Sequence, residues 1–252
     1  MCPNPRRAAV YHRGVIAGTE LGECTYSQFD GTAPTLMVPV GSTEQHGPHL
    51  PLDTDTRIAT AVARSVAAGL GHLLAPAIPY GASGEHQSFP GTISIGTAAL
   101  TAVLVEYARS ACDWAPRLVF VNGHGGNLDA LRSATATLRR EGRDTGWVSV
   151  RAQEPGDSPA DFHAGHTETS LLLHLCPQVV RRERYVRGNT APLAELLPAL
   201  RSGGVAAVSP SGVLGDPTTA TAAAGSRIFA DMVADCLRRV RQWRPGPDGM
   251  LG

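Results

Sequence analysis

Short apolar segments alternate with amphipathic segments along this chain, and that order limits the possible folds more than any other feature. Runs typical of buried strands occupy residues 35–40, 72–81, 117–127 and 146–152. Segments with helical spacing of apolar residues lie at 56–70, 97–114 and 128–141, with a long one before residue 243. Strands connected through helices form parallel sheets with helices on both faces. The sequence therefore predicts an α/β fold, a three-layer α-β-α sandwich with a mostly parallel central sheet.

A single domain is expected over residues 1–252, because the 252 residues contain no internal repeat and no linker-like break. The two ends, residues 1–8 and 244–252, are expected to be flexible tails. Thr54 or Asp55 is expected to cap the start of the helix at 56–70, and Gly71 to end it.

The composition excludes several classes of function. The net charge is zero and no basic stripe is present, so neither nucleic acid nor a membrane is an expected partner. All 22 basic residues are arginines, which excludes a Schiff-base lysine and a phosphate-loop lysine. The five cysteines are widely spread and lack a Cys-x-x-Cys pattern, which argues against a disulfide framework. With no signal-peptide-like segment, the expected location is the cytoplasm.

The segment VPVGSTEQHGPHLPLDTDT carries five side chains that can bind metal or move protons: Glu44, His46, His49, Asp53 and Asp55. In an extended segment Glu44 and His46 point to the same side, and Asp55, at a helix entry, can direct its carboxylate to the same cavity. A Glu, a His and an Asp form a mixed nitrogen and oxygen ligand set. For His49 and Asp53, an ordinary polar loop residue is an equally good interpretation.

Three more polar clusters follow predicted strands or precede a helix. NGHGGN contains His124, whose flanking glycines allow close approach of a ligand. HAGHTETS contains His163, His166 and Glu168, and GEHQ contains Glu85 and His86 as a substrate-facing loop. The alternatives are a packed core histidine at 124 and a carboxylate that only stabilises the helix dipole at 168.

Sites in parallel sheets lie beyond the carboxyl ends of the strands, where these clusters would meet. The ligands suffice for two divalent ions, Zn2+ or Fe2+ or else Mn2+, that share one carboxylate. Such a pair acidifies a water molecule and polarises a carbonyl. Ligation by oxygen and nitrogen alone therefore favours hydrolysis over electron transfer.

Four motifs, GSTEQHGPHLPLDTDT, FPGTISIG, VNGHGGN and HAGHTETS, together resemble the creatininase family of metal-dependent amidohydrolases. The resemblance runs from about residue 35 to 175 and more weakly to the last helix. It implies a creatininase-like α/β fold, a two-metal centre and a homo-oligomer, a hexamer or a similar assembly of dimers.

The resemblance also implies residue roles. One ion would be held by Glu44, Asp55 and His124, and the other by His46, Asp55 and Glu168, with Asp55 bridging. His163 would contact substrate and move protons, with Glu168 as the other catalytic group. Glu85, His86, His166 and Asn127 are the expected substrate-binding residues.

Two departures argue against creatinine as substrate. Creatininase carries a metal-binding Glu two places after the histidine of NGH, where this chain has Gly126. Creatininase also covers its substrate with tryptophans, whereas Trp114, Trp147 and Trp243 lie outside residues 150–175.

Within the family, YGASGEHQ and DFHAGHTETSLLLH are most similar to the subgroup of the mycofactocin system. This likeness implies a peptidase that hydrolyses a modified precursor peptide and releases its C-terminal Val-Tyr dipeptide by attack of metal-bound hydroxide on the amide. Three alternatives stay open: an amidohydrolase acting on a small cyclic amide or formamide, a dinuclear phosphoesterase, and a non-catalytic metal-containing scaffold that binds peptide.

Overall fold

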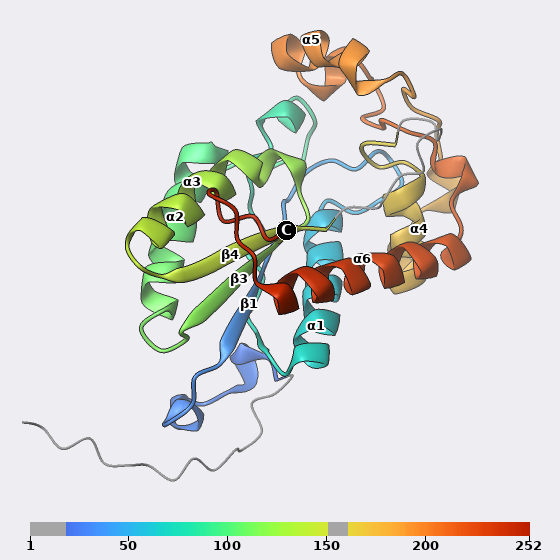
Figure 1. Cartoon of the computed structure of the whole chain (residues 1–252). Coiled ribbons are helices and arrows are strands. Elements are labelled where there is room, and N and C mark those ends of the chain that lie inside the picture. Colours follow the sequence, from blue (N-terminus) through green and yellow to red (C-terminus); the bar gives the residue numbers. More distant parts are fainter. Residues whose placement is uncertain (1–18, 151–160) are drawn as a thin grey trace, which may run out of the picture.

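The central layer is a sheet of four parallel strands. The computed structural model describes residues 19–150 and 161–252 (Figure 1). The strands are β1 (Thr35–Val40), β2 (Leu73–Leu74), β3 (Arg117–Asn122) and β4 (Asp144–Ser149), in the spatial order β2-β1-β3-β4. All three pairs of neighbours are parallel. The predicted parallel α/β sheet is confirmed.

Helices cover both faces of the sheet, as Figure 1 shows. One face packs against α1 (Thr54–Leu70), α4 (His166–Leu175) and α6 (Ala222–Gln242). The other packs against α2 (Gly96–Ala111) and α3 (Leu128–Arg140). Val119 and Val121 of β3 face the first group, and Leu118 and Phe120 face the second, because side chains alternate along a strand. This two-sided burial explains why the strands read as continuous apolar runs.

The first helix differs from its prediction at one end. It begins at Thr54 after Asp53 as N-cap, without a side-chain capping bond. The prediction that Thr54 or Asp55 caps the helix is wrong, because both lie inside the first turn and are buried. Gly71 ends the helix in the left-handed conformation, with φ of 67°, as predicted for a residue without a Cβ.

The second predicted strand is much shorter than residues 72–81. Only Leu73–Leu74 pair continuously, followed by an isolated bridge from Val40 to Ile78. Pro76 and Pro79 lack the N–H that a continuous ladder requires, which interrupts the strand.

Helix α5 (Leu193–Gly203) has no counterpart in the sequence prediction. It projects at the top of the molecule in Figure 1. Leu196 packs with Val205 and Leu214 in a small apolar cluster of its own.

The C-terminal residues are packed rather than flexible, so the prediction of a tail at 244–252 is wrong. The backbone N–H of Trp147 in β4 donates to the carbonyl of Gly249 at 3.0 Å, and the backbone carbonyl of Trp147 accepts from the N–H of Leu251 at 2.9 Å. The Leu251 side chain is fully buried. The segment thereby covers the edge of β4, which would otherwise expose unpaired backbone groups. Residues 1–8 lie outside the described residues.

Replacing Leu251 with Ala is expected to lower the free energy of unfolding by about 2–5 kcal/mol, the usual cost of truncating a buried leucine. Replacing the neighbouring Met250, whose side chain is 40% exposed, should change it by less than about 0.5 kcal/mol. Urea unfolding of both variants measures the difference, and equal stabilities would contradict the packing described for this segment.

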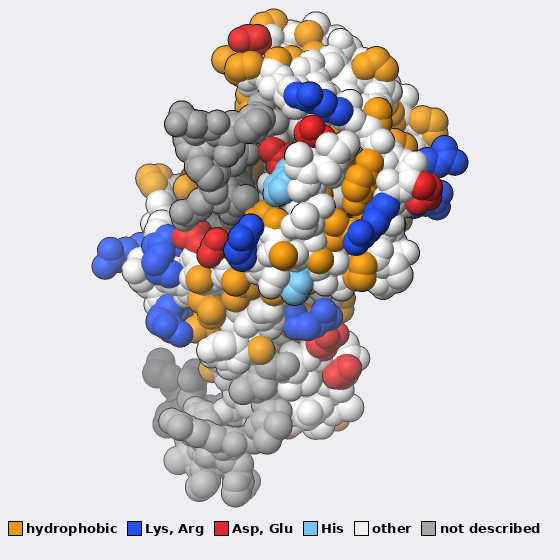
Figure 2. Space-filling model, turned by 90° about the vertical axis from the view of Figure 1, so that its right-hand side faces the viewer, with side chains coloured by type: hydrophobic (Ala, Val, Ile, Leu, Met, Phe, Trp, Pro, Cys, Tyr) orange, Lys and Arg blue, Asp and Glu red, His pale blue; other side chains and the backbone are white. Residues whose placement is uncertain are grey.

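The outer surface fits the charge pattern of the sequence. Within residues 19–150 and 161–252, no helix combines the length and apolarity needed to cross a bilayer. Figure 2 shows basic and acidic side chains interspersed on one face of the molecule.

Candidate metal centre

The loop after β1 brings its acidic and imidazole side chains back toward the sheet. Its base is closed by a hydrogen bond from the N–H of Glu44 to the carbonyl of Leu52 at 2.9 Å. Glu44 and His46 are both fully buried, as expected for alternate residues of an extended segment that faces the interior. Asp55, in the first turn of α1, is 2% exposed and completes the group.

The first set of candidate ligands consists of Glu44, Asp55 and His124, whose ligand atoms all lie within 4.8 Å of one another. His124 follows the carboxyl end of β3. Its Nδ1 is 3.1 Å from Asp55 Oδ2, and its Nε2 is 3.2 Å from Glu44 Oε2. These three side chains come from the β1 loop, α1 and the β3 loop, so the parallel sheet creates the set.

The second set consists of His46, Asp55 and Glu168. His46 Nε2 is 3.1 Å from Asp55 Oδ1 and 3.8 Å from Glu168 Oε2. Asp55 therefore directs one oxygen to each set. Ser42 donates a hydrogen bond to Asp55 Oδ2 at 2.7 Å and holds that carboxylate in place.

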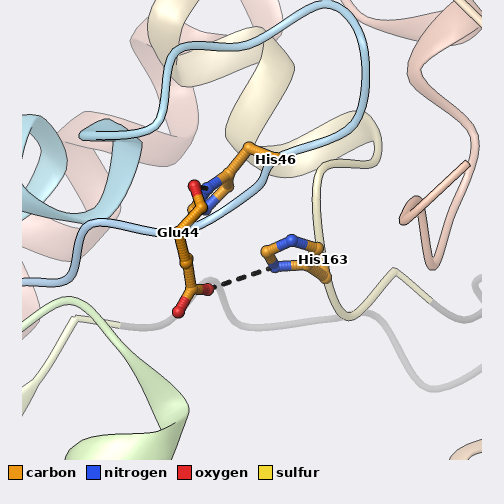
Figure 3. A group of neighbouring side chains, drawn as sticks. All are labelled: Glu44, His46 and His163. Carbon is orange, nitrogen blue, oxygen red and sulfur yellow. Dashed lines mark hydrogen bonds and ion pairs between the residues drawn. The ribbon is translucent and has the colours of Figure 1, made fainter. Parts of the chain in front are cut away.

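A third grouping of candidate ligands joins Glu44, His46 and His163. Figure 3 shows Glu44 and His46 on one loop and His163 approaching from another segment. His163 Nδ1 lies 3.8 Å from Glu44 Oε1, and its ring centroid lies 4.3 Å from that of His46. Geometry alone thus permits His163 to act either as a ligand or as a proton carrier.

The segment before α4 is strained at a residue between two of these groups. Ala164 is buried and has φ of 52°, a conformation unfavourable for a residue with a Cβ. Its N–H donates to Glu168 Oε2 at 2.6 Å. On its other side, His163 exchanges backbone hydrogen bonds with Leu214, of 3.1 and 2.8 Å. These bonds hold His163 and Glu168 toward the same site.

The side chains fit divalent ions on a direct structural test. Both carboxylate oxygens of Glu44 are buried, and neither has a hydrogen-bond partner among the described residues. A buried carboxylate that accepts no hydrogen bond is very costly unless a positive charge lies beside it, as a metal ion or a protonated His124 would. The donors are carboxylate oxygens and imidazole nitrogens, which suit Zn, Fe(II) or Mn(II).

The protonation of the centre shows how strongly its charges interact. Burial raises the pKa of Glu44 to about 7. Burial alone would lower the pKa values of His46 and His124, but the nearby carboxylates outweigh it and raise them to about 10 and about 9. Asp55 has a pKa well below its usual value, because its attraction to both histidines exceeds the effect of burial. Without ions, the imidazolium groups neutralise the carboxylates.

These pKa values predict that metal binding releases protons. At pH 8 His46 and His124 are protonated in the metal-free protein, so about two protons should leave when ions bind. At pH 6 Glu44 and Glu168 are also mostly protonated, and about four should leave. Apparent zinc affinity should therefore rise with pH. Calorimetry of zinc binding in two buffers of different ionisation enthalpy measures the count, and zero released protons would contradict the prediction.

A cavity of about 580 Å³ opens beside both ligand sets. His124, His163 and Glu168 line it together with apolar side chains. The apolar side chains that contribute to its wall are Ile58, Val150, Phe162, Leu171, Leu193 and Met232. This volume suits a ligand of several hundred daltons, held mainly by apolar contacts with a few polar groups.

The four predicted substrate-binding residues occupy different environments. Glu85 Oε1 lies 3.7 Å from His124 Nε2, and His86 Nε2 lies 3.4 Å from Glu44 Oε1. His166 is half-buried and its Nδ1 is 2.8 Å from Thr219 Oγ1. Asn127 is fully buried, and its amide donates to the Gly41 carbonyl and accepts from the Ala82 N–H. The structure thus uses Asn127 to connect two loops, while Glu85 and His86 adjoin the ligand sets.

His49 and Asp53 lie outside both ligand sets. His49 is buried, with Nε2 at 2.9 Å from Thr169 Oγ1. Asp53 is partly exposed and pairs with Arg57 at 2.7 Å. Sequence reasoning overlooked Ser42 and Gln45, which contact the centre directly. Ser42 precedes Glu44 by two residues, so the same alternation rule would have found it.

Comparison with known proteins places this chain in a family. Residues 22–240 match the family described as creatininase, creatinine amidohydrolase. The chain is 64% identical over 250 residues to a mycofactocin precursor peptide peptidase of Mycobacterium ulcerans, across 96% of this chain and 98% of that one. A protein of the same name from Mycolicibacterium smegmatis is 59% identical over 249 residues, across 96% and 99%.

Solved structures agree with the sequence comparison. The crystal structure of creatinine amidohydrolase (creatininase) has a TM-score of 0.74 at 29% identity and covers 90% of this chain and 98% of its own. The predicted family resemblance is thereby confirmed: this chain belongs to the creatininase family.

Proposed function

We propose that this protein is a metal-dependent peptidase of mycofactocin biosynthesis that hydrolyses the modified precursor peptide and releases its C-terminal Val-Tyr dipeptide. The observation that carries the proposal is the pair of ligand sets sharing Asp55 at the edge of the cavity. Relatives at 59–64% identity bear the name of this peptidase. Creatinine is not the proposed substrate, since Gly126 stands where creatininase has a ligand.

Two divalent ions per subunit are proposed, Zn2+ or Fe2+, with Mn2+ as a further candidate. Glu44, Asp55 and His124 would hold one, and His46, Asp55 and Glu168 the other. Such ions supply an acidified water and a polarised carbonyl. A solved relative carries manganese in its title, "Creatininase Mn", and mixed nitrogen and oxygen sets accept all three metals.

The residues around the ions would manage the protons of amide hydrolysis. His163 takes one proton from the attacking water at its Nδ1 and delivers it to the amide nitrogen as the C–N bond breaks. The new carboxyl group gives the second proton of the water to the released amine, so the products are a carboxylate and an ammonium group. Amide nitrogen is a poor leaving group, so this delivery is required. Glu168, about one-fifth exposed at the cavity, is the other candidate carrier.

The proposed assembly is a homo-oligomer, a hexamer or similar assembly of dimers. Exposed apolar side chains on three neighbouring loops support this: Leu52, Tyr80 and Ile93. Two of these loops bond to the backbone of Thr43 and Glu44. Light scattering of the purified protein measures the assembly. A cytoplasmic location is also proposed, because the cysteines in the described part of the chain are free thiols.

The direct test is mass spectrometry of the modified precursor peptide incubated with metal-loaded protein, beside a Glu44→Ala control. Release of the dipeptide by the unaltered protein only is the expected result. An intact peptide with two metals bound per chain would transfer the search to small cyclic amides or formamides. An intact peptide with no metal bound would refute the metal centre itself.

A further inference from the structure

Gln45 lies in the sequence between two proposed ligands, Glu44 and His46. Only 5% of the residue is exposed. Its amide nitrogen lies within hydrogen-bond distance of three atoms: His86 Nδ1 at 2.9 Å, His163 Nε2 at 3.0 Å and the Gly212 carbonyl at 3.1 Å. A single neutral side chain thus contacts two of the histidines that adjoin Glu44.

Neighbouring backbone fixes the orientation of this amide. Its oxygen accepts the N–H of Gly47 at 2.9 Å. Because an N–H can only donate, the oxygen belongs on that side and the NH2 group faces the histidines. Gly212 leaves room for this amide, since a Cβ there would lie 2.0 Å from the amide oxygen. The amide therefore cannot turn over without losing a buried hydrogen bond.

Counting donors and acceptors then assigns the ring hydrogens. The backbone carbonyl of Gln45 lies 2.8 Å from His163 Nε2 and can only accept, so this nitrogen carries a hydrogen. The two amide hydrogens then serve the Gly212 carbonyl and His86 Nδ1. This arrangement satisfies all three acceptors with three hydrogens. The alternative, with the amide donating to His163, leaves one or more buried acceptors without a donor, which is costly.

We propose that Gln45 is a positioning residue whose backbone carbonyl and side-chain amide fix the tautomers of His163 and His86. One ring then offers a hydrogen-bond acceptor beside Glu44 Oε1, and the other offers a donor there. His163 presents an unprotonated Nδ1, 3.8 Å from Glu44 Oε1. His86 presents an Nε2–H, 3.4 Å from the same oxygen. Both histidines are buried, and a neutral ring has one donor and one acceptor.

The catalytic meaning of this arrangement rests on the proposed peptide hydrolysis. His163 would accept a proton from the attacking water and return it to the amine, so no proton is gained or lost at the ring in a full cycle. His86 would donate a hydrogen bond to an oxygen beside Glu44. Exchanged tautomers would place a donor where a proton must be accepted, and hydrolysis would slow without any change in the metal ligands.

The test is nitrogen-15 NMR of histidine-labelled, zinc-loaded full-length protein and of the metal-free form. Two-bond correlations distinguish protonated from unprotonated ring nitrogens, and His86→Gln and His163→Gln variants assign the signals. The expected spectrum has hydrogen on Nε2 of both rings. Hydrogen on His86 Nδ1 or on His163 Nδ1 in the unaltered protein overturns the proposal, whether or not any peptide is cleaved.

Side-chain variants test the cause. In the Gln45→Glu variant the carboxylate accepts a hydrogen bond instead of donating one, so the ring hydrogen of His86 should move to Nδ1. The tautomer of His163 should not change, because the backbone carbonyl of residue 45 still accepts from its Nε2. We expect kcat for the precursor peptide to fall about 10²-fold, with KM within about threefold and zinc content unchanged. Gln87→Glu places the same charge on an exposed neighbour of His86 and should change neither spectrum nor kcat.

A neutral variant covers the case in which the added charge prevents folding. Gln45→Met has similar length and no donor, so His86 should lose its single tautomer and show signals of both. A His86 tautomer that is unchanged in the folded Gln45 variants overturns the positioning role. Loss of peptide cleavage in every protein, with the tautomers as expected, would instead refute the proposed substrate.

Discussion

Replacing Asp55 with Asn is expected to remove metal from both ligand sets and to lower peptide hydrolysis about 10³-fold or more. Asp55 places Oδ1 3.1 Å from His46 and Oδ2 3.1 Å from His124, so one substitution removes the charge common to both sets. Polarisation by a metal contributes several kcal/mol to a transition state, and each 1.36 kcal/mol is a factor of ten in rate. Metal content by plasma mass spectrometry and peptide turnover measure the two effects.

Asp53→Asn is the matched control for this variant. It makes the same chemical change two residues earlier, at a partly exposed carboxylate that pairs with Arg57. Surface ion pairs contribute about 1 kcal/mol at most, so metal content and turnover should stay near those of the unaltered protein. Two ions retained by folded Asp55→Asn protein would refute the shared carboxylate.

Replacing His163 with Ala is expected to lower kcat by about 10²–10⁴-fold, the usual contribution of a positioned acid or base. Bound metal should stay nearly unchanged, because each ligand set is complete without this residue. His174→Ala is the control, since His174 lies exposed on α4 and contacts Phe229 away from the centre.

The same His163 variant distinguishes the two roles that its geometry permits. Its ring nitrogen also belongs to a third ligand grouping with Glu44 and His46. Loss of one metal ion in His163→Ala protein would make His163 a ligand, and proton delivery would then fall to Glu168 or another group. Unchanged turnover would remove it from both roles.

The polar clusters were predictable from the sequence because the position of each cluster depends on the neighbouring strand or helix in the chain. Glu44 and His46 alternate along an extended loop, and parallel strands end at one edge of the sheet. Those two rules bring His124, in the loop after β3, to Asp55, in the first turn of α1. The burial on both faces of the sheet was equally readable, since β1 and β3 are unbroken apolar runs.

Other features of the chain followed from contacts that no local pattern records. Helix α5 has apolar residues at helical spacing, yet it contains Pro198, a residue that is unfavourable in a helix interior. The C-terminal residues 244–252 resemble a tail in composition and are held by pairing with β4. Composition indicates whether a segment can be disordered. It does not show that β4, about 100 residues earlier in the sequence, holds this segment in place.

The sequence by itself determined the fold class through its periodicity and the family through the resemblance of its motifs, and residue chemistry indicated the candidate donor atoms of the centre. Only the tertiary structure decided how those atoms are distributed. It shows that Asp55 faces both sets with separate oxygens and that Gln45 contacts two histidines 41 and 118 residues away in the chain. The physical reason is that hydrogen-bond direction and tautomer depend on which groups meet in space, and chain separation carries no information about that.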